Sequence, residues 1–170
     1  MSLSPEKLAE VREAVAGSPA AMTMQLARRL GVPEAEVIRA MPDGRGVELD
    51  LSRWQEIFAA FEGLGVVTVI VTNGSVTCEV NGEFGGFSTF GEFFNVQSET
   101  LDLHVRHEQL GSAFAVEKPG HLNGNPTLSV QFFDKKGDSA LKVFLNFGGR
   151  PTKEREEWFG QVKARFGKVP

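Results

Sequence analysis

Seven residues between positions 101 and 107 bring two of the chain's three histidines together with a carboxylate and a guanidinium. Polar and apolar residues alternate in Leu101-Asp102-Leu103-His104-Val105-Arg106-His107, which predicts a β-strand whose successive side chains point to opposite faces. Asp102, His104 and Arg106 then share one face and His107 lies on the other, so the two histidines cannot bind one metal ion without a bulge. His104 could ligate a metal while Arg106 binds an anionic group of the same ligand. The alternative is a solvent-exposed polar face that binds nothing.

A second cluster is aromatic: between residues 82 and 94, five phenylalanines alternate with four glycines. They could be core residues and turns, or they could line an apolar pocket in which the glycines let a flat ligand approach the backbone. No glycine-rich phosphate motif follows a strand and opens a helix. We read Cys78 as structural and His121, in a loop, as a surface histidine, and we assign no catalytic residue.

The composition excludes several kinds of site. The chain has 170 residues with one cysteine and no tyrosine, so it forms no internal disulfide, no multi-cysteine zinc site and no phenolate ligand. Its net charge of −4 argues against a whole-chain nucleic-acid binder. Apolar stretches are too short for a membrane helix, and the polar N-terminus is unlike a secretory signal. With a lone thiol, we expect a cytoplasmic protein.

The elements that must position these residues change character near residue 65. Residues 1–64 carry helical periodicity and caps, residues 65–150 carry two-residue alternation and turn signals, and residues 151–170 return to a helix. The β-branched run of residues 66–72 predicts a strand, Asn73-Gly74 and Asn81-Gly82 predict hairpin turns, and the apolar stripe of residues 153–166 predicts the last helix. Short links favour antiparallel pairing of consecutive strands. We therefore predict one α+β domain over residues 1–170, with helices packed against a large antiparallel meander sheet.

The segment from Gln25 to Ile38 matches the helix-turn-helix pattern, with Gly31 at the turn. This pattern predicts a close helix pair more specifically than it predicts DNA binding. Glu34 and Glu36 open the second helix, where a DNA reader would meet phosphates, and their carboxylates would repel the backbone. We therefore expect a packing unit, although a DNA-binding regulator remains an alternative.

Several short motifs, in order, resemble those of one family. They are Gly91-Glu92-Phe93-Phe94-Asn95-Val96, the strand from Leu101 to Arg106, Glu117-Lys118-Pro119, Ser129-Val130-Gln131-Phe132-Phe133-Asp134 and Lys142-Val143-Phe144, behind a helical opening from Met24 to Asp43. The sequence is similar in these stretches to the HutX/ChuX family of intracellular haem utilisation proteins, which is related to HemS/ChuS. The resemblance covers most of the chain.

The resemblance implies a large antiparallel sheet covered by helices, a homodimer, and haem that is bound in the cytoplasm and passed to a degrading enzyme. His104 and Arg106 match the family's "HLR" strand and Lys142 matches its "KVF" stretch. One departure is that the stretch from Phe87 to Glu92 has neither the histidine nor the tyrosine that many relatives place there. The iron ligand is then His104, His107, His121, a methionine or water.

We therefore expect a non-enzymatic haem carrier in which His104 ligates the iron. Arg106 and Lys142 would neutralise propionates, and His107, Phe90 and Phe94 would complete the pocket. Three alternatives stay open: a haem-degrading enzyme, a ligand-sensing DNA-binding regulator, and a member of the family fold that has lost haem binding.

Overall fold

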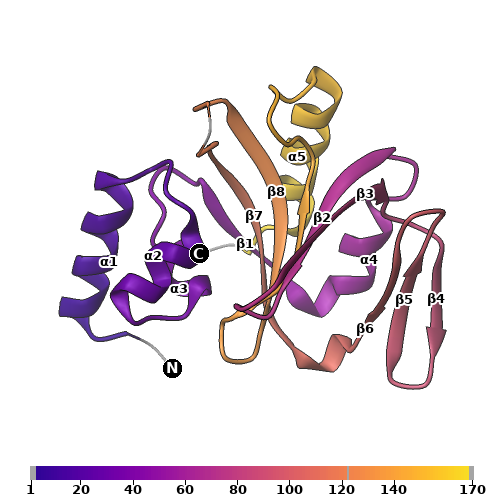
Figure 1. Cartoon of the computed structure of the whole chain (residues 1–170), viewed down its shortest axis with the longest axis horizontal. Helices are drawn as coiled ribbons and strands as arrows, with labels where there is room; N and C mark the ends of the chain where they lie inside the picture. The colour runs from indigo at the N-terminus through magenta and orange to yellow at the C-terminus, as the bar shows by residue number, and fades with distance from the viewer. Residues whose placement is uncertain (1–2, 122, 169–170) are drawn as a thin grey trace.

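The computed structural model describes residues 3–121 and 123–168 and shows a helical unit beside a layered body of strands and helices (Figure 1). Within these residues the strands form a six-stranded and a three-stranded sheet, both antiparallel. Except for one short strand that lies between two of them, helices precede the strands, and one long helix, α5 (Lys153–Phe166), follows the strands. The predicted α+β class is thereby confirmed. None of the helices in this part of the chain has the length and hydropathy that a membrane span requires.

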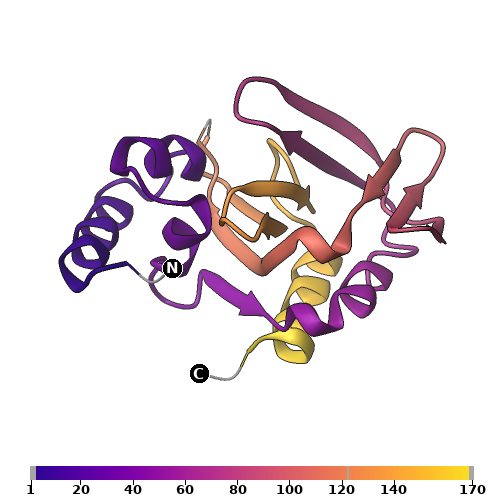
Figure 2. The same ribbon diagram turned by 90° about the horizontal axis from the view of Figure 1, so that it is seen from below.

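The N-terminal helical unit consists of α1 (Pro5–Gly17), α2 (Thr23–Leu30) and α3 (Glu34–Arg39). Between α2 and α3, Gly31 adopts a left-handed φ of 65°, which ends α2 and turns the chain. Aliphatic side chains of the three helices pack together into a small hydrophobic core of their own. Figure 2 shows the unit standing at one side of the sheet.

The six-stranded sheet has the order β1-β7-β8-β9-β2-β3. Its strands are β1 (Gly46–Leu49), β2 (Val66–Thr72), β3 (Thr77–Glu83), β7 (Leu110–Pro119), β8 (Pro126–Asp134) and β9 (Ser139–Phe144). The prediction that residues 1–64 are helical is wrong at β1, which pairs with β7. Four residues are too few to show periodicity, and their partner lies far away in sequence.

The turns of the first hairpin agree only in part with expectation. Asn73-Gly74 lies between β2 and β3, as predicted, but Asn81-Gly82 lies inside β3 and pairs with β2 rather than turning the chain. A Cβ atom on Gly82 would come within 2.1 Å of the Thr100 hydroxyl. This glycine therefore permits a close approach between segments and does not mark a turn.

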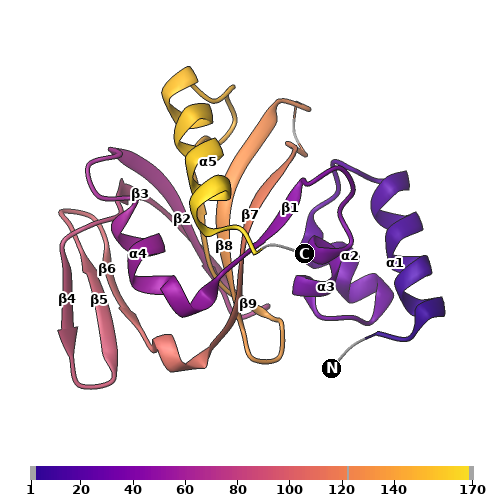
Figure 3. The same ribbon diagram turned by 180° about the vertical axis from the view of Figure 1, so that it is seen from behind.

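The predicted meander is divided into two sheets. The three-stranded sheet, β4 (Phe87–Phe90), β5 (Phe93–Gln97) and β6 (Asp102–Val105), packs with α4 (Trp54–Ala59) and α5 over one face of the six-stranded sheet (Figure 3). Between these layers lies the main core, in which Phe58 contacts several other aromatic rings. The opposite face of the six-stranded sheet is turned toward the helical unit.

The second helix of the helix-turn-helix pattern is used for packing. In α3, Ala35 and Ile38 lie against Phe114, Val116 and Phe133 on the outer face of the six-stranded sheet. Glu34 and Ala35, which open this helix where a DNA reader would meet the groove, are both buried within the protein.

Candidate functional site

His104 lies on the outward face of the three-stranded sheet. Its Nδ1 donates to the Asn95 side-chain oxygen at 2.7 Å, and its Nε2 is 3.5 Å from an oxygen of Asp102. Asn95 is itself buried and donates to Ser88. Because Nδ1 donates this hydrogen bond, Nε2 is the ring nitrogen with a lone pair. The His104 ring is therefore oriented so that Nε2 could bind a metal ion.

Arg106 and His107 follow β6 and are engaged by protein groups. Arg106 forms an ion pair with Glu92 at 3.0 Å. The prediction that the strand runs to His107 is wrong, because β6 ends at Val105 and His107 opens the short 3-10 helix η2 (His107–Gln109). The His107 ring stacks on Trp54 with a centroid separation of 4.5 Å. His107 therefore points to the core side while His104 faces solvent.

The two phenylalanines of the predicted site have different surroundings. Phe94 is 9% exposed and lies in the main core against Trp54 and Phe58, whereas Phe90 is 79% exposed near the β4–β5 turn. The two side chains accordingly do not form the two walls of one slot.

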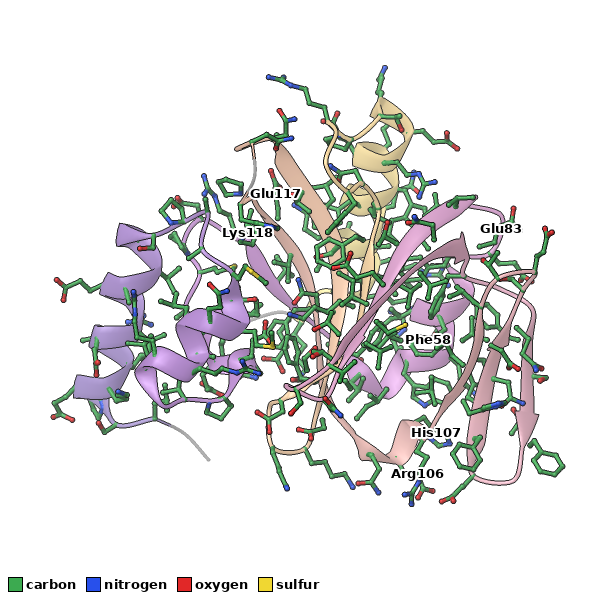
Figure 4. The ribbon with its side chains drawn as sticks, viewed as in Figure 1. Phe58, Glu83, Arg106, His107, Glu117 and Lys118 are labelled. Carbon is green, nitrogen blue, oxygen red and sulfur yellow. The ribbon has the colours of Figure 1, made fainter. Side chains whose placement is uncertain are left out.

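Lys142 lies on the other side of the six-stranded sheet from His104. It belongs to a row formed by Gln131 on β8, Lys142 on β9, Ile70 on β2 and Glu79 on β3, which the strand register places side by side. All four line a cleft between this sheet and the helical unit. Figure 4 shows Lys118, another residue of this cleft, far from Arg106 and His107.

The cleft is broad, and most of the surface that lines it is apolar. Its cavity volume is about 140 Å³, and about 990 Å³ of space lies between the atoms when the open mouth is included. Small-molecule pockets hold roughly 300–1,000 Å³, so a ligand of that size would extend into the mouth of this cleft. Met22 and Met24 line it from the helical unit, and Phe144 and Phe147 line it from the sheet. Phe147 remains 44% exposed, and its ring lies 5.5 Å from that of Phe144 in an edge-on arrangement. Such exposed apolar side chains are what a flat hydrophobic ligand would cover.

Lys118, at the end of β7, gives the cleft its available positive charge. Its ammonium donates to the backbone oxygens of Pro119 at 2.9 Å and Ala20 at 3.4 Å, and no carboxylate among the described residues pairs with it. Burial, and secondly the charge of Lys142, lowers the pKa of Lys118 from its ordinary value of 10.5. An ammonium has three N–H donors, so one remains for a ligand.

Lys142 is already neutralised. Its ammonium donates to a carboxylate oxygen of Glu34 at 2.5 Å, and the Thr23 hydroxyl donates to the same oxygen at 2.5 Å. The three residues tie the start of α2 and the start of α3 to β9.

The cleft also contains groups that could ligate a metal or orient a ligand. His121 lies in the loop after β7 and lines the cleft together with the thioethers of Met22 and Met24. Gln131 donates to the Ser129 hydroxyl at 2.9 Å, while its side-chain oxygen is buried without a partner in the described part of the chain. A buried, unpaired amide oxygen of this kind is available to a ligand or to water.

The sequence pattern does not assign Lys118 to the site, although this residue belongs to the Glu117-Lys118-Pro119 motif. One local signal does point to it: Lys118 ends a long apolar strand, and a lysine at such a place keeps its ammonium near an edge or opening. Periodicity does not show which face of the sheet the helical unit covers, and this decides whether Lys118 lies in the cleft.

Comparison with known proteins places the chain in a family. A model of the family described as haem utilisation ChuX/HutX matches residues 47–160. The intracellular haem transport protein HutX of Vibrio cholerae is 26% identical over 159 residues, which cover 92% of this chain and 79% of HutX. The structure of the haem-binding protein ChuX has a TM-score of 0.80 at 22% identity, with 91% of this chain and 97% of ChuX covered.

A longer structure contains the same fold within about half of its length. The haem-degrading enzyme ChuS of Escherichia coli O157:H7 has a TM-score of 0.77 at 24% identity, and the match covers 97% of this chain but 48% of ChuS. The family model, in contrast, spans more than half of this chain. The chain therefore belongs to the ChuX/HutX family of haem utilisation proteins.

Proposed function

We propose that this protein binds haem in the cleft between the helical unit and the six-stranded sheet, and that it acts as a haem carrier. The observation that supports this most strongly is an open, mostly apolar cleft in which the Lys118 ammonium has no carboxylate partner among the described residues. HutX and ChuX, by their names, transport or bind haem, and this chain shares their family.

The residues of the cleft fit haem. The porphyrin ring needs apolar walls, which Phe144, Phe147 and Met22 provide. A propionate needs a cation, and the Lys118 ammonium has a free donor directed by two backbone carbonyls. The iron needs one or two axial donors, and His121 with a methionine thioether supplies the ligand types found in known haem proteins.

We propose His121 as the iron ligand. It is the one histidine among the described residues that line the cleft. His104 remains a second candidate, because its Nδ1 hydrogen bond to Asn95 orients Nε2 for a metal, and Arg106 follows two residues later. Haem bound there would lie on the outward face of the three-stranded sheet and could not reach Lys142.

Three finer proposals concern the setting of the carrier. We place the protein in the cytoplasm, in keeping with a single thiol and with the intracellular description of HutX. We propose a homodimer, because the chain matches 48% of the ChuS chain and two copies would equal that length. We further propose that a haem-degrading enzyme receives the haem, since a bound and unmodified cargo requires an acceptor.

Haemin titration followed at the Soret band tests the proposal. Wild-type protein should show a saturable change at one haem per chain, His121→Ala should shift the spectrum, and His104→Ala should leave it unchanged. A shift confined to His104→Ala would move the site to the three-stranded sheet. The absence of saturable binding by wild-type protein would refute the carrier function.

A further inference from the structure

Glu34 occupies the position on Lys142 that a ligand carboxylate would need. Its carboxylate oxygen lies 2.5 Å from the Lys142 ammonium, and the side chains of the pair are only 3% and 11% exposed. Thr23 fixes the same oxygen from the first residue of α2. The carboxylate therefore has two donors that hold it against Lys142.

The pair stands between two cavities. Lys142 lines the cleft, while Glu34 lines a second, more polar pocket between α2, the β2–β3 hairpin and the β8–β9 turn. Met24 and Thr72 line both cavities, so the two are adjacent. Glu34 thus reaches Lys142 from behind the cleft and does not obstruct its apolar part.

The charges that face the ligand are consequently few. Lys142 and Glu34 cancel, Glu79 adds a negative charge to the lining, and Lys118 is the unneutralised cation among the described lining residues. A ligand with two carboxylates meets one available ammonium and not two.

We propose that Glu34 is a specificity- and affinity-determining residue, which competes with the ligand's second carboxylate for Lys142. This inference rests on the proposed function. Wild-type protein then binds one propionate strongly at Lys118 and leaves the other in solvent. Lys142 becomes available only if Glu34 moves away, and Glu34 belongs to the helical unit. Affinity is thereby held below what the two lysines could provide, which suits a protein that must release its cargo.

The test is haemin affinity of Glu34→Gln. The glutamine retains an acceptor for Thr23 but leaves the charge of Lys142 uncompensated, so we expect roughly 10-fold tighter binding from one new charge-assisted contact. The rate of haem transfer from this variant to excess apomyoglobin should fall by a similar factor. The control is Glu36→Gln, which removes a carboxylate from the same helix that pairs with Arg39 and lines neither cavity. In Glu34→Gln/Lys142→Met the gain should disappear.

A second measurement needs no variant. The affinity of wild-type protein for haemin monomethyl ester should be within about twofold of its affinity for haemin, because a solvent-exposed carboxylate contributes little to binding. A large loss with the monoester, or an unchanged affinity in folded Glu34→Gln, would overturn the inference while the carrier function stands. If wild-type protein fails to bind haemin, both fall together. If Glu34→Gln does not fold, the ester comparison decides.

Discussion

Replacement of Lys118 by methionine removes the cation that we propose binds a carboxylate of the ligand. Methionine keeps the length and apolar stem of the side chain but loses its charge and donors. A hydrogen bond with a charged partner contributes about 1.5–3 kcal/mol, which corresponds to a roughly 12-fold to 150-fold loss of haem affinity. The burial of Lys118 against Ala20 and Pro119 places the expected value in the upper half of that range.

The stability of the same variant should change in the opposite direction. Burial lowers the pKa of Lys118, so the ammonium is less favourable in the folded protein than in the unfolded chain. This penalty is complete below the lowered pKa and disappears as pH rises from there to the ordinary value of 10.5. Lys118→Met should therefore unfold at an equal or higher denaturant concentration than wild type, and the difference should shrink as pH approaches 10.5.

Haemin titrations at neutral and alkaline pH provide the assay for Lys118. Wild-type protein should bind haemin more tightly than Lys118→Met does, by the largest factor where the Lys118 ammonium is fully protonated. This factor should fall as the ammonium loses its proton, at a pH below 10.5 because the pKa of Lys118 is lowered from that value. The matched control is Lys153→Met, an equal change of charge on α5, which packs over the opposite face of the sheet. A loss of haem affinity of less than about threefold in folded Lys118→Met, or an equal loss in Lys153→Met, would show that Lys118 does not bind the ligand carboxylate.

Three further predictions concern stability and chemistry. Lys142→Met should lower the free energy of unfolding in urea by about 3–5 kcal/mol, because it leaves the buried Glu34 carboxylate without its ammonium partner. A smaller loss would mean that the carboxylate can reach solvent in the variant. Gly82→Ala should destabilise by about 1–3 kcal/mol in the same assay, since its Cβ would collide with Thr100. The haem-loaded protein should keep its Soret band when ascorbate is added in air, whereas loss of the band with a tetrapyrrole product would identify a degrading enzyme.

Local signals sufficed for much of the fold. The helix of residues 153–166 and the strand of residues 66–72 lie where periodicity predicts them, because each carries a full stripe or a β-branched run. What failed depended on distant partners. The strand at Gly46–Leu49 exists only through its pairing with β7, and Gly82 serves the approach of Thr100.

In the candidate site too, features set by neighbouring residues could be predicted, whereas contacts between distant segments could not. Alternation places His104 and His107 on opposite faces of the predicted strand. Their side chains do lie on opposite sides, His104 toward solvent and His107 on Trp54, although the strand ends before His107. Alternation could not show that Lys142 faces the opposite side of the molecule or that Glu34 neutralises it from 108 positions earlier in the chain. Only the packing of the helical unit on the sheet brings Lys118, Lys142 and the cleft methionines together.

The segments that bound haem covers show whether it occupies the cleft. Hydrogen–deuterium exchange measured by mass spectrometry, with and without one equivalent of haemin, reports which backbone segments become protected. Haem in the cleft should protect residues 20–26, 118–121 and 142–149, which line or flank the cleft, and leave exchange at residues 88–107 unchanged. Protection confined to residues 88–107 would instead place the haem on the three-stranded sheet and exclude the cleft as its site.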